Sequence, residues 1–199
     1  MKPTDKHKSQ LRTSIDKIYQ LGNECWSEIE PFIYIKELSK NEYFSKEGQL
    51  IKEFGFIING ILRIFYLNDE GKEWNKHFLL KNDFVASGIS PDRKSITNIQ
   101  ALSKTQILCV PYAELIKISN KHKEIILFIQ KLTFEYLEKK QRREIRLLSG
   151  KALDNYLWFK NTYPDLENKI KQYHIAGYLG ITPTQLSRLR KKSNTHQHM

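Results

Sequence analysis

Hydrophobic residues follow a helical period in the first part of the chain. Ile15, Ile18, Tyr19 and Leu21 recur at spacings that place them on one side of a helix. The pattern predicts helical structure over residues 13–39, with an interruption at Pro31 because proline cannot continue a helix.

The period changes beyond residue 53, where short segments rich in Ile, Phe, Leu, Tyr and Trp alternate with turn signals. The signals are Asn59-Gly60, the cluster 68–71 and Asn82-Asp83, and they are evenly spaced. Asn-Gly favours a hairpin because both residues tolerate positive φ. Residues 95–100 and 105–110 predict two further strands, and a short helix is expected after Pro111. The region therefore predicts an antiparallel β-sandwich or barrel.

A long helical pattern follows over residues 120–149. A helix of roughly thirty residues would be about 45 Å long. Its first half is apolar, so we expect it to bury one face against a second copy of the chain, although packing on its own barrel alone is the alternative. The basic run 139–143 is interpreted as a solvated face. A hinge is expected at Leu148–Gly150, and then a helix over 151–168 that ends near Tyr163-Pro164.

The C-terminal segment predicts a helix-turn-helix. Ala176 permits close approach of two helices, Gly180 supplies the positive φ of a tight turn, and Leu186 and Leu189 share one face of the second helix. Thr182 begins that helix as an N-cap, with proline following and glutamine three positions after the cap.

The outward face of this second helix carries residues that suit DNA. We expect base edges in the major groove to be read by Thr184, Gln185 and Arg188, with Arg188 as the candidate bidentate guanine contact. Contacts to the phosphate backbone are expected from Thr182, Ser187, Arg190, Lys191 and Lys192. The alternative is a helical hairpin that only packs at the end of the chain.

The distribution of charge supports a polyanionic partner. The 199-residue chain has a net charge of +11. Residues 1–120 hold 17 Lys and Arg against 15 Asp and Glu, a net charge of +2, whereas residues 121–199 hold 16 against 7, a net charge of +9. The basic excess therefore lies in the segment with the helix-turn-helix motif, as expected for a DNA-binding domain.

Other classes of site find little support in the composition. Two cysteines, Cys25 and Cys109, cannot supply the four thiolates of a typical iron–sulfur cluster, and their scarcity favours a reducing cytoplasm. No apolar run is long enough for a membrane span, and no signal region begins the chain. His77 stands alone on its predicted strand. We therefore expect no metal, no cofactor, no catalytic site and no membrane partner.

The whole order of elements resembles the Crp/Fnr family of transcription regulators. The resemblance is strongest in IAGYLGITPTQLSRLRKK, which is similar to the family's DNA-binding motif, and moderate from Gly60 to Phe84, which resembles its cyclic-nucleotide-binding barrel. It implies an α+β fold with three parts: a sensory jelly-roll barrel with flanking helices over 1–118, a dimerisation helix over 119–149 and a helix-turn-helix domain over 150–199.

The resemblance also implies partners. These are a homodimer, a palindromic operator in double-stranded DNA with one recognition helix per half-site, RNA polymerase as a candidate, and an effector in the barrel. Nucleotide-binding relatives carry a glutamate for the ribose and an arginine for the cyclic phosphate. Here Ser87 replaces the glutamate, and Lys94-Ser95 stands where Arg-Ser is expected. Cyclic AMP is therefore not the expected effector, and a polar pocket around Ser87, Gly88, Lys94 and Ser95 would indicate a small anion instead.

Two rival functions remain open from the sequence. A sensory or scaffold protein with a degenerate helix-turn-helix would share these elements. A cupin-type metalloenzyme would need at least two converging histidines and a carboxylate, whereas the strands offer only His77.

Overall fold

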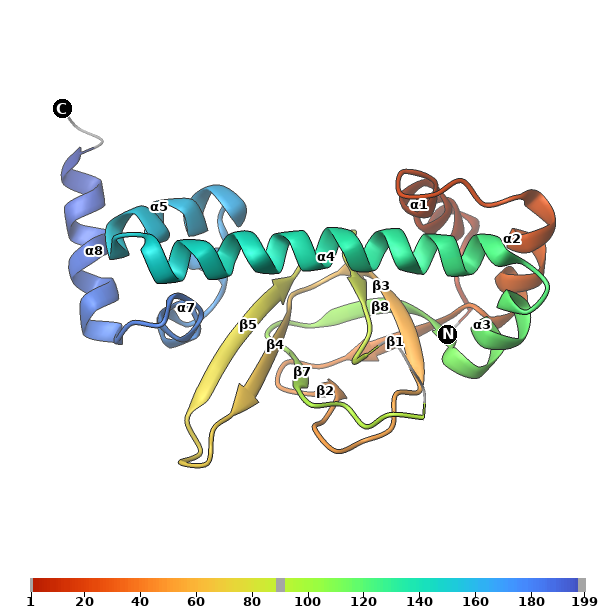
Figure 1. Ribbon diagram of the computed structural model, residues 1–199, viewed down its shortest axis with the longest axis horizontal. Helices are drawn as coiled ribbons and strands as arrows, with labels where there is room; N and C mark the ends of the chain where they lie inside the picture. The colour runs from red at the N-terminus through yellow and green to blue at the C-terminus, as the bar shows by residue number, and fades with distance from the viewer. Residues whose placement is uncertain (1, 89–91, 197–199) are drawn as a thin grey trace. The chain divides into compact units, whose positions relative to one another are not determined.

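A computed structural model describes residues 2–88 and 92–196 and has a mixed α+β fold (Figure 1). The chain forms two compact units. Unit 1 comprises residues up to Tyr66 together with Phe78–Glu135, and unit 2 comprises Leu67–His77 and the residues from Tyr136 onward. Among the described residues, no helix is long and apolar enough to cross a membrane.

The N-terminal region is less helical than the sequence pattern predicts. Helices α1 (Asp5–Asp16) and α2 (Asn23–Ile29) are followed by a short 3-10 helix, η1 (Glu30–Phe32), and then by strand β1 (Tyr34–Leu38). The prediction of helix through residue 39 is therefore wrong at its end. Residues 34–38 pair with β8 (Thr105–Pro111) instead, because their alternating side chains can be buried on a sheet.

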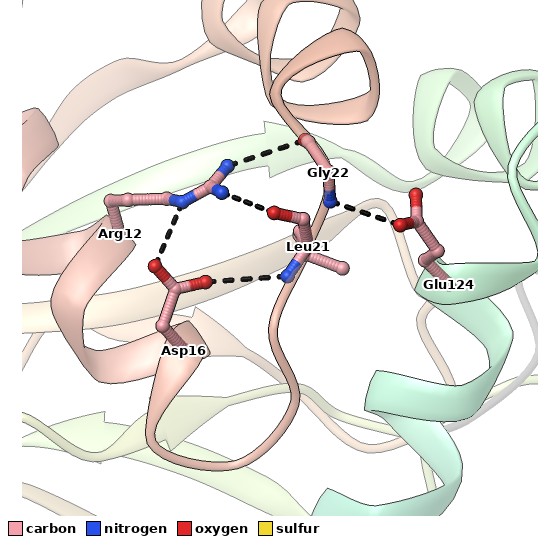
Figure 2. A network of polar contacts seen from close by, with 5 residues as sticks. All are labelled: Arg12, Asp16, Leu21, Gly22 and Glu124. Atoms are coloured by element: carbon pink, nitrogen blue, oxygen red, sulfur yellow. Dashed lines mark hydrogen bonds and ion pairs between the residues drawn. The ribbon is translucent and has the colours of Figure 1, made fainter.

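A polar network fixes the break between α1 and α2 (Figure 2). The Arg12 guanidinium donates to the carbonyls of Leu21 and Gly22 and pairs with Asp16 at 2.9 Å. Asp16 accepts from the Leu21 amide at 3.3 Å, and Glu124 accepts from the Gly22 amide at 2.9 Å. Arg12 thus supplies donors to carbonyls that no longer belong to a helix.

Two four-stranded antiparallel sheets form the β region, which confirms the jelly-roll-like prediction. Their orders are β1-β8-β3-β6 and β2-β7-β4-β5. The remaining strands are β2 (Tyr43–Ser45), β3 (Glu53–Asn59), β4 (Leu62–Leu67), β5 (Glu73–Leu79), β6 (Phe84–Val85) and β7 (Asn98–Ala101). The core of this region contains Ile57, Leu62, Ile99 and Ile107, whose side chains are fully buried.

The three predicted turns are present. Gly60 has φ +110°, and a Cβ there would lie 2.6 Å from the Cα of Thr105, so only glycine fits. Gly71 and Asn82 also have positive φ. Strand β7 begins at Asn98 rather than at Ser95, because Ser95 Oγ donates to the Thr97 carbonyl at 2.7 Å and holds a local turn.

The later helices follow the predicted order. They are α3 (Tyr112–Ser119), α4 (Lys123–Ser149), α5 (Ala152–Thr162), α6 (Leu166–Lys169), α7 (Gln172–Leu179) and α8 (Pro183–His196). The helix expected over 151–168 is two helices, because the chain leaves the helix before Pro164 and Asp165 adopts φ +60°. The predicted break near Gly150 is confirmed at the end of α4.

Candidate nucleic-acid interface

Helices α7 and α8 form the predicted helix-turn-helix within unit 2. Helix α7 ends at Gly180, which has φ +68°, and the Ile181 amide donates back to the Ala176 carbonyl at 3.1 Å. Ala176 and Leu186 are buried at the contact between the two helices, and their small and branched side chains allow close packing. These contacts fix the orientation of α8 relative to α7, and they involve residues that are close together in the sequence.

A capping box begins α8. The backbone N–H of Gln185 donates to Thr182 Oγ1 at 3.2 Å, and the backbone N–H of Thr182 donates to the side-chain oxygen Oε1 of Gln185 at 2.9 Å. Two donors that the helix cannot satisfy itself are thereby paired. The Gln185 side chain is oriented by this bond through Oε1, and its Nε2 has no part in the capping box.

The face of α8 opposite Leu186 is polar and basic. Seven of the eight residues predicted to contact DNA are exposed: Thr182, Thr184, Gln185, Ser187, Arg188, Lys191 and Lys192. Thr184 and Arg188 are one helical turn apart, so both can reach neighbouring base pairs.

Arg190 differs from the other residues of this set. Its side chain is partly buried, and its guanidinium lies 3.9 Å from a carboxylate oxygen of Glu167. The other Glu167 oxygen accepts the Tyr156 hydroxyl at 2.7 Å. Arg190 therefore helps to hold α8 on its own unit, and a phosphate would have to compete with Glu167 for it.

Helix α4 carries an exposed row of apolar side chains. Phe134 is 59% exposed, Ile145 63% and Leu148 82%. Together with Ile126, Leu127 and Leu137, they fall within about 100° of one another around the helix axis at 3.6 residues per turn, so they share one side of the helix. Exposed apolar rows of this kind are typical of helices that pack against a partner.

The four residues expected to form an effector pocket all lie beside the segment 49–51 of unit 1, but they do not all line one pocket. Ser87 lines an open pocket of about 480 Å³ together with Lys36, Tyr43 and Glu53. Gly88 lies against Ile51, Lys94 is exposed beside Leu50, and Ser95 is buried with its hydroxyl bonded to Thr97. Of the four, Ser87 is the residue that reaches this pocket.

Comparison with known proteins finds one matching domain family and several solved structures with a similar fold. Residues 35–122 match the family model of the cyclic nucleotide-binding domain. No curated protein is significantly similar in sequence. The structure of FixK2 from Bradyrhizobium japonicum is similar at a TM-score of 0.74 and 17% identity, covering 83% of this chain and 86% of that chain.

Two further structures share the architecture. One is CLP of Xanthomonas campestris, with a TM-score of 0.72 and 11% identity over 88% of this chain and 93% of that chain. The other is a Eubacterium rectale protein assigned to the crp/fnr family of transcriptional regulators, with a TM-score of 0.71 and 16% identity over 88% and 85%. The chain has the Crp/Fnr fold.

Within this Crp/Fnr fold, three potential metal ligands lie together that the sequence analysis missed. The donor atoms of Cys25, His122 and Glu124 are all within 4.8 Å of one another. The Nε2 atom of His122 already lies 3.2 Å from the carboxylate of Glu28. Burial and the neighbouring Glu124 raise the pKa of the Cys25 thiol to about 11, so a metal would have to displace its proton. Distance along the chain hid this grouping.

His77 is a structural residue of unit 2. Its ring nitrogen Nδ1 lies 3.0 Å from the Tyr163 hydroxyl, and its ring meets that of Tyr136 edge-on. Burial lowers its pKa to about 4, with further contributions from Lys139 and Arg143. Among the strands that the structure describes there is no second histidine, so the ligand set of a cupin-type metal site is missing from them.

Proposed function

We propose that this chain is a sequence-specific transcription regulator of the Crp/Fnr type that binds double-stranded DNA. The observation that carries the proposal is the exposed polar and basic face of α8 opposite the buried Leu186. Thr184 and Arg188 read base edges, while Ser187, Lys191 and Lys192 contact phosphates. The Gln185 side chain is oriented by its capping bond, which leaves Nε2 free of that role for a contact with DNA.

The proposed regulator acts as a homodimer on a palindromic operator. The exposed apolar row on α4, from Ile126 to Leu148, supports this arrangement because a second copy would remove it from water. Two-fold symmetry would then place two recognition helices about 34 Å apart along the DNA. A Phe134→Glu substitution is expected to give a monomer in sedimentation experiments, whereas Phe32→Glu, at an exposed phenylalanine outside α4, leaves the dimer intact.

The effector of the proposed regulator is not cyclic AMP. Solved proteins with this fold take different ligands: CLP is c-di-GMP responsive, CprK has been solved complexed with OCPA, and PfPKA-R has been solved bound to cAMP. The fold therefore does not specify the ligand. Ser87 offers a ribose hydroxyl a neutral acceptor in place of a charged carboxylate, and Lys94 is a point charge rather than a bidentate fork.

Selection of genomic DNA fragments by the purified protein tests the proposal directly. We expect a small set of enriched fragments that share a palindrome. On such a fragment Arg188→Ala should weaken binding by about 1–3 kcal/mol and relax one base position, whereas binding to random DNA changes little. Arg93→Ala removes the same charge from an exposed site in unit 1 and serves as the matched control.

Two results would contradict this function. Retention of no fragment at low salt would favour a sensory or scaffold protein with a degenerate DNA-binding domain. Equal loss of affinity for operator and random DNA on Arg188→Ala would remove the base-reading role and leave only backbone binding.

Lys192→Ala should weaken binding to all DNA sequences alike and reduce the salt dependence of binding.

A further inference from the structure

Unit 2 contains a cavity of about 210 Å³ whose lining is strongly cationic. Its lining includes no acidic side chain. Five basic side chains contribute to it: Lys76 of β5 and Lys139, Lys140, Arg142 and Arg143 of α4. We refer to this cavity as the basic pocket. Every lining residue belongs to unit 2.

The cations of the basic pocket repel one another. Burial lowers the pKa of Lys76, and the charges of Lys140 and Arg143 lower it further. Arg142 lies 3.7 Å from Glu138 in an exposed pair, which relieves little of this repulsion. Like charges gathered around a hollow destabilise the empty state, and an anion placed among them would reverse that effect.

Arg143 is held in place for such an anion. One terminal nitrogen donates to the carbonyls of Tyr178 and Asn75, and the guanidinium lies 4.3 Å from the centre of the Tyr178 ring. Its Nε is buried and has no hydrogen-bond partner. Because Nε is closed off from the pocket, an oxyanion would meet the terminal nitrogens of the guanidinium.

Aromatic rings form the rest of the lining. Trp158 and Tyr178 are stacked at 6.2 Å with an interplanar angle of 15°, and Tyr136 and Tyr163 flank His77. His77 is neutral at physiological pH, so it adds a polar ring rather than a sixth charge. Rings beside cations suit a ligand that has both a planar apolar part and a negative group.

We propose that the basic pocket binds a small molecule that carries a phosphate group and a planar ring. The phosphate accepts from the terminal nitrogens of the Arg143 guanidinium and is neutralised by Lys76 and Lys140, while the ring lies against the aromatic side chains. A dianionic phosphate is favoured over a single carboxylate because five cations line the pocket and no anion does.

The bound molecule would also reach the DNA-binding element, in so far as the proposed function holds. Arg143 contacts the carbonyl of Tyr178, and Tyr178 belongs to α7, the first helix of the helix-turn-helix. An anion that draws the Arg143 guanidinium would weaken or redirect this contact. Occupancy of the pocket should therefore change the affinity for DNA.

Calorimetric titration of the full chain with phenyl phosphate, inorganic phosphate and benzoate, without DNA, tests the proposal. We expect saturable binding of phenyl phosphate, weaker binding of inorganic phosphate and the weakest of benzoate. Arg143→Lys keeps the charge but loses the planar guanidinium with its paired donors and should weaken phenyl phosphate binding by about tenfold. Lys140→Gln should weaken it by roughly threefold, and Lys123→Gln, on the same helix but outside the pocket, should not.

Two outcomes would overturn the proposal: no saturable binding by the unaltered chain, or binding that neither Arg143→Lys nor Lys140→Gln changes. Benzoate binding as tightly as phenyl phosphate would overturn the assignment to phosphate. Quenching of Trp158 fluorescence in a chain with Trp26→Phe and Trp74→Phe places the ligand at this site. Because these titrations contain no DNA, their failure is distinct from a failure of DNA binding, which the fragment selection measures separately.

Discussion

Two hollows, the one in the core of unit 1 and the basic pocket of unit 2, are lined by opposite chemistry. The core of unit 1 contains a cavity of about 30 Å³ lined almost wholly by apolar side chains, Leu11, Phe56, Leu108 and Phe128 among them. The basic pocket of unit 2 is about 210 Å³ and is lined by cations and aromatic rings. A small apolar hollow is what imperfect packing leaves behind. A larger hollow surrounded by like charges destabilises its own fold, and a bound anion would offset that cost.

The largest effect should come from enlarging the apolar hollow. Phe56→Ala removes a side chain that is 1% exposed and should lower the free energy of unfolding by about 3–5 kcal/mol. Phe32→Ala, at a side chain that is 40% exposed, should cost far less. Urea denaturation measures both. Equal losses would mean that Phe56 does not lie in a close-packed core.

The next effect concerns protonation beside the basic pocket. The ordinary pKa of histidine is 6.5, and burial lowers that of His77 to about 4. The unfolded chain therefore binds a proton that the folded chain does not in this pH range, and stability is lost as the pH falls from about 6.5 towards 4. For a partly exposed ring we expect a loss on the order of 2 kcal/mol.

His77→Gln should remove this component of the pH dependence. The measurement is the free energy of unfolding across that pH range, compared between the two chains. If the two curves keep a constant separation, His77 is not the group that titrates. Apolar lining cannot produce such a dependence in unit 1, so the experiment separates the two hollows by their chemistry.

A smaller effect tests the capping box of α8. Thr182→Ala should destabilise unit 2 by about 1 kcal/mol, because the backbone N–H of Gln185 loses its acceptor. Thr184→Ala is the matched control, since its exposed hydroxyl has no capping role in the pair described above. We expect the control to keep its stability while losing affinity for DNA. The reverse result would exchange the roles assigned to the two threonines.

The smallest effect is a gain. Lys140→Gln removes one of the charges that repel Lys76 and should raise stability by a few tenths of a kcal/mol. The gain should disappear at about 1 M salt, where the screening length is near 3 Å. Lys123→Gln provides the comparison outside the pocket. A loss of stability with Lys140→Gln would show that the pocket is not strained by its charges.

Local signals account for what the sequence predicted well. Gly180, Thr182 and Leu186 act within a few residues of one another, so the helix-turn-helix followed from the sequence and is confirmed. Evenly spaced turn residues likewise identified the strands. The N-terminal helix was overestimated because the pairing of β1 with β8 depends on a strand about seventy residues away.

The basic pocket could not be predicted, because β5, α4, α5 and α7 contribute to it from distant parts of the chain. The basic run 139–143 was interpreted as a solvated face, which is right for Lys139 and Lys140 but wrong for Arg143. Arg143 is partly buried and bonded to two backbone carbonyls. The sequence shows that basic residues are concentrated in the run 139–143, but it does not show which of these side chains is buried.

The capping box limits how the recognition surface can be re-engineered. A library that randomises Thr184 and Arg188 explores new base preferences on an intact helix, because neither side chain belongs to the capping pair. Randomising position 185 instead mixes two phenotypes, since most replacements for Gln185 also release the Thr182 amide. Variants selected at that position would be enriched for helices that still fold rather than for new specificity. Fewer positions of α8 can therefore be substituted to change base preference than its exposed surface suggests.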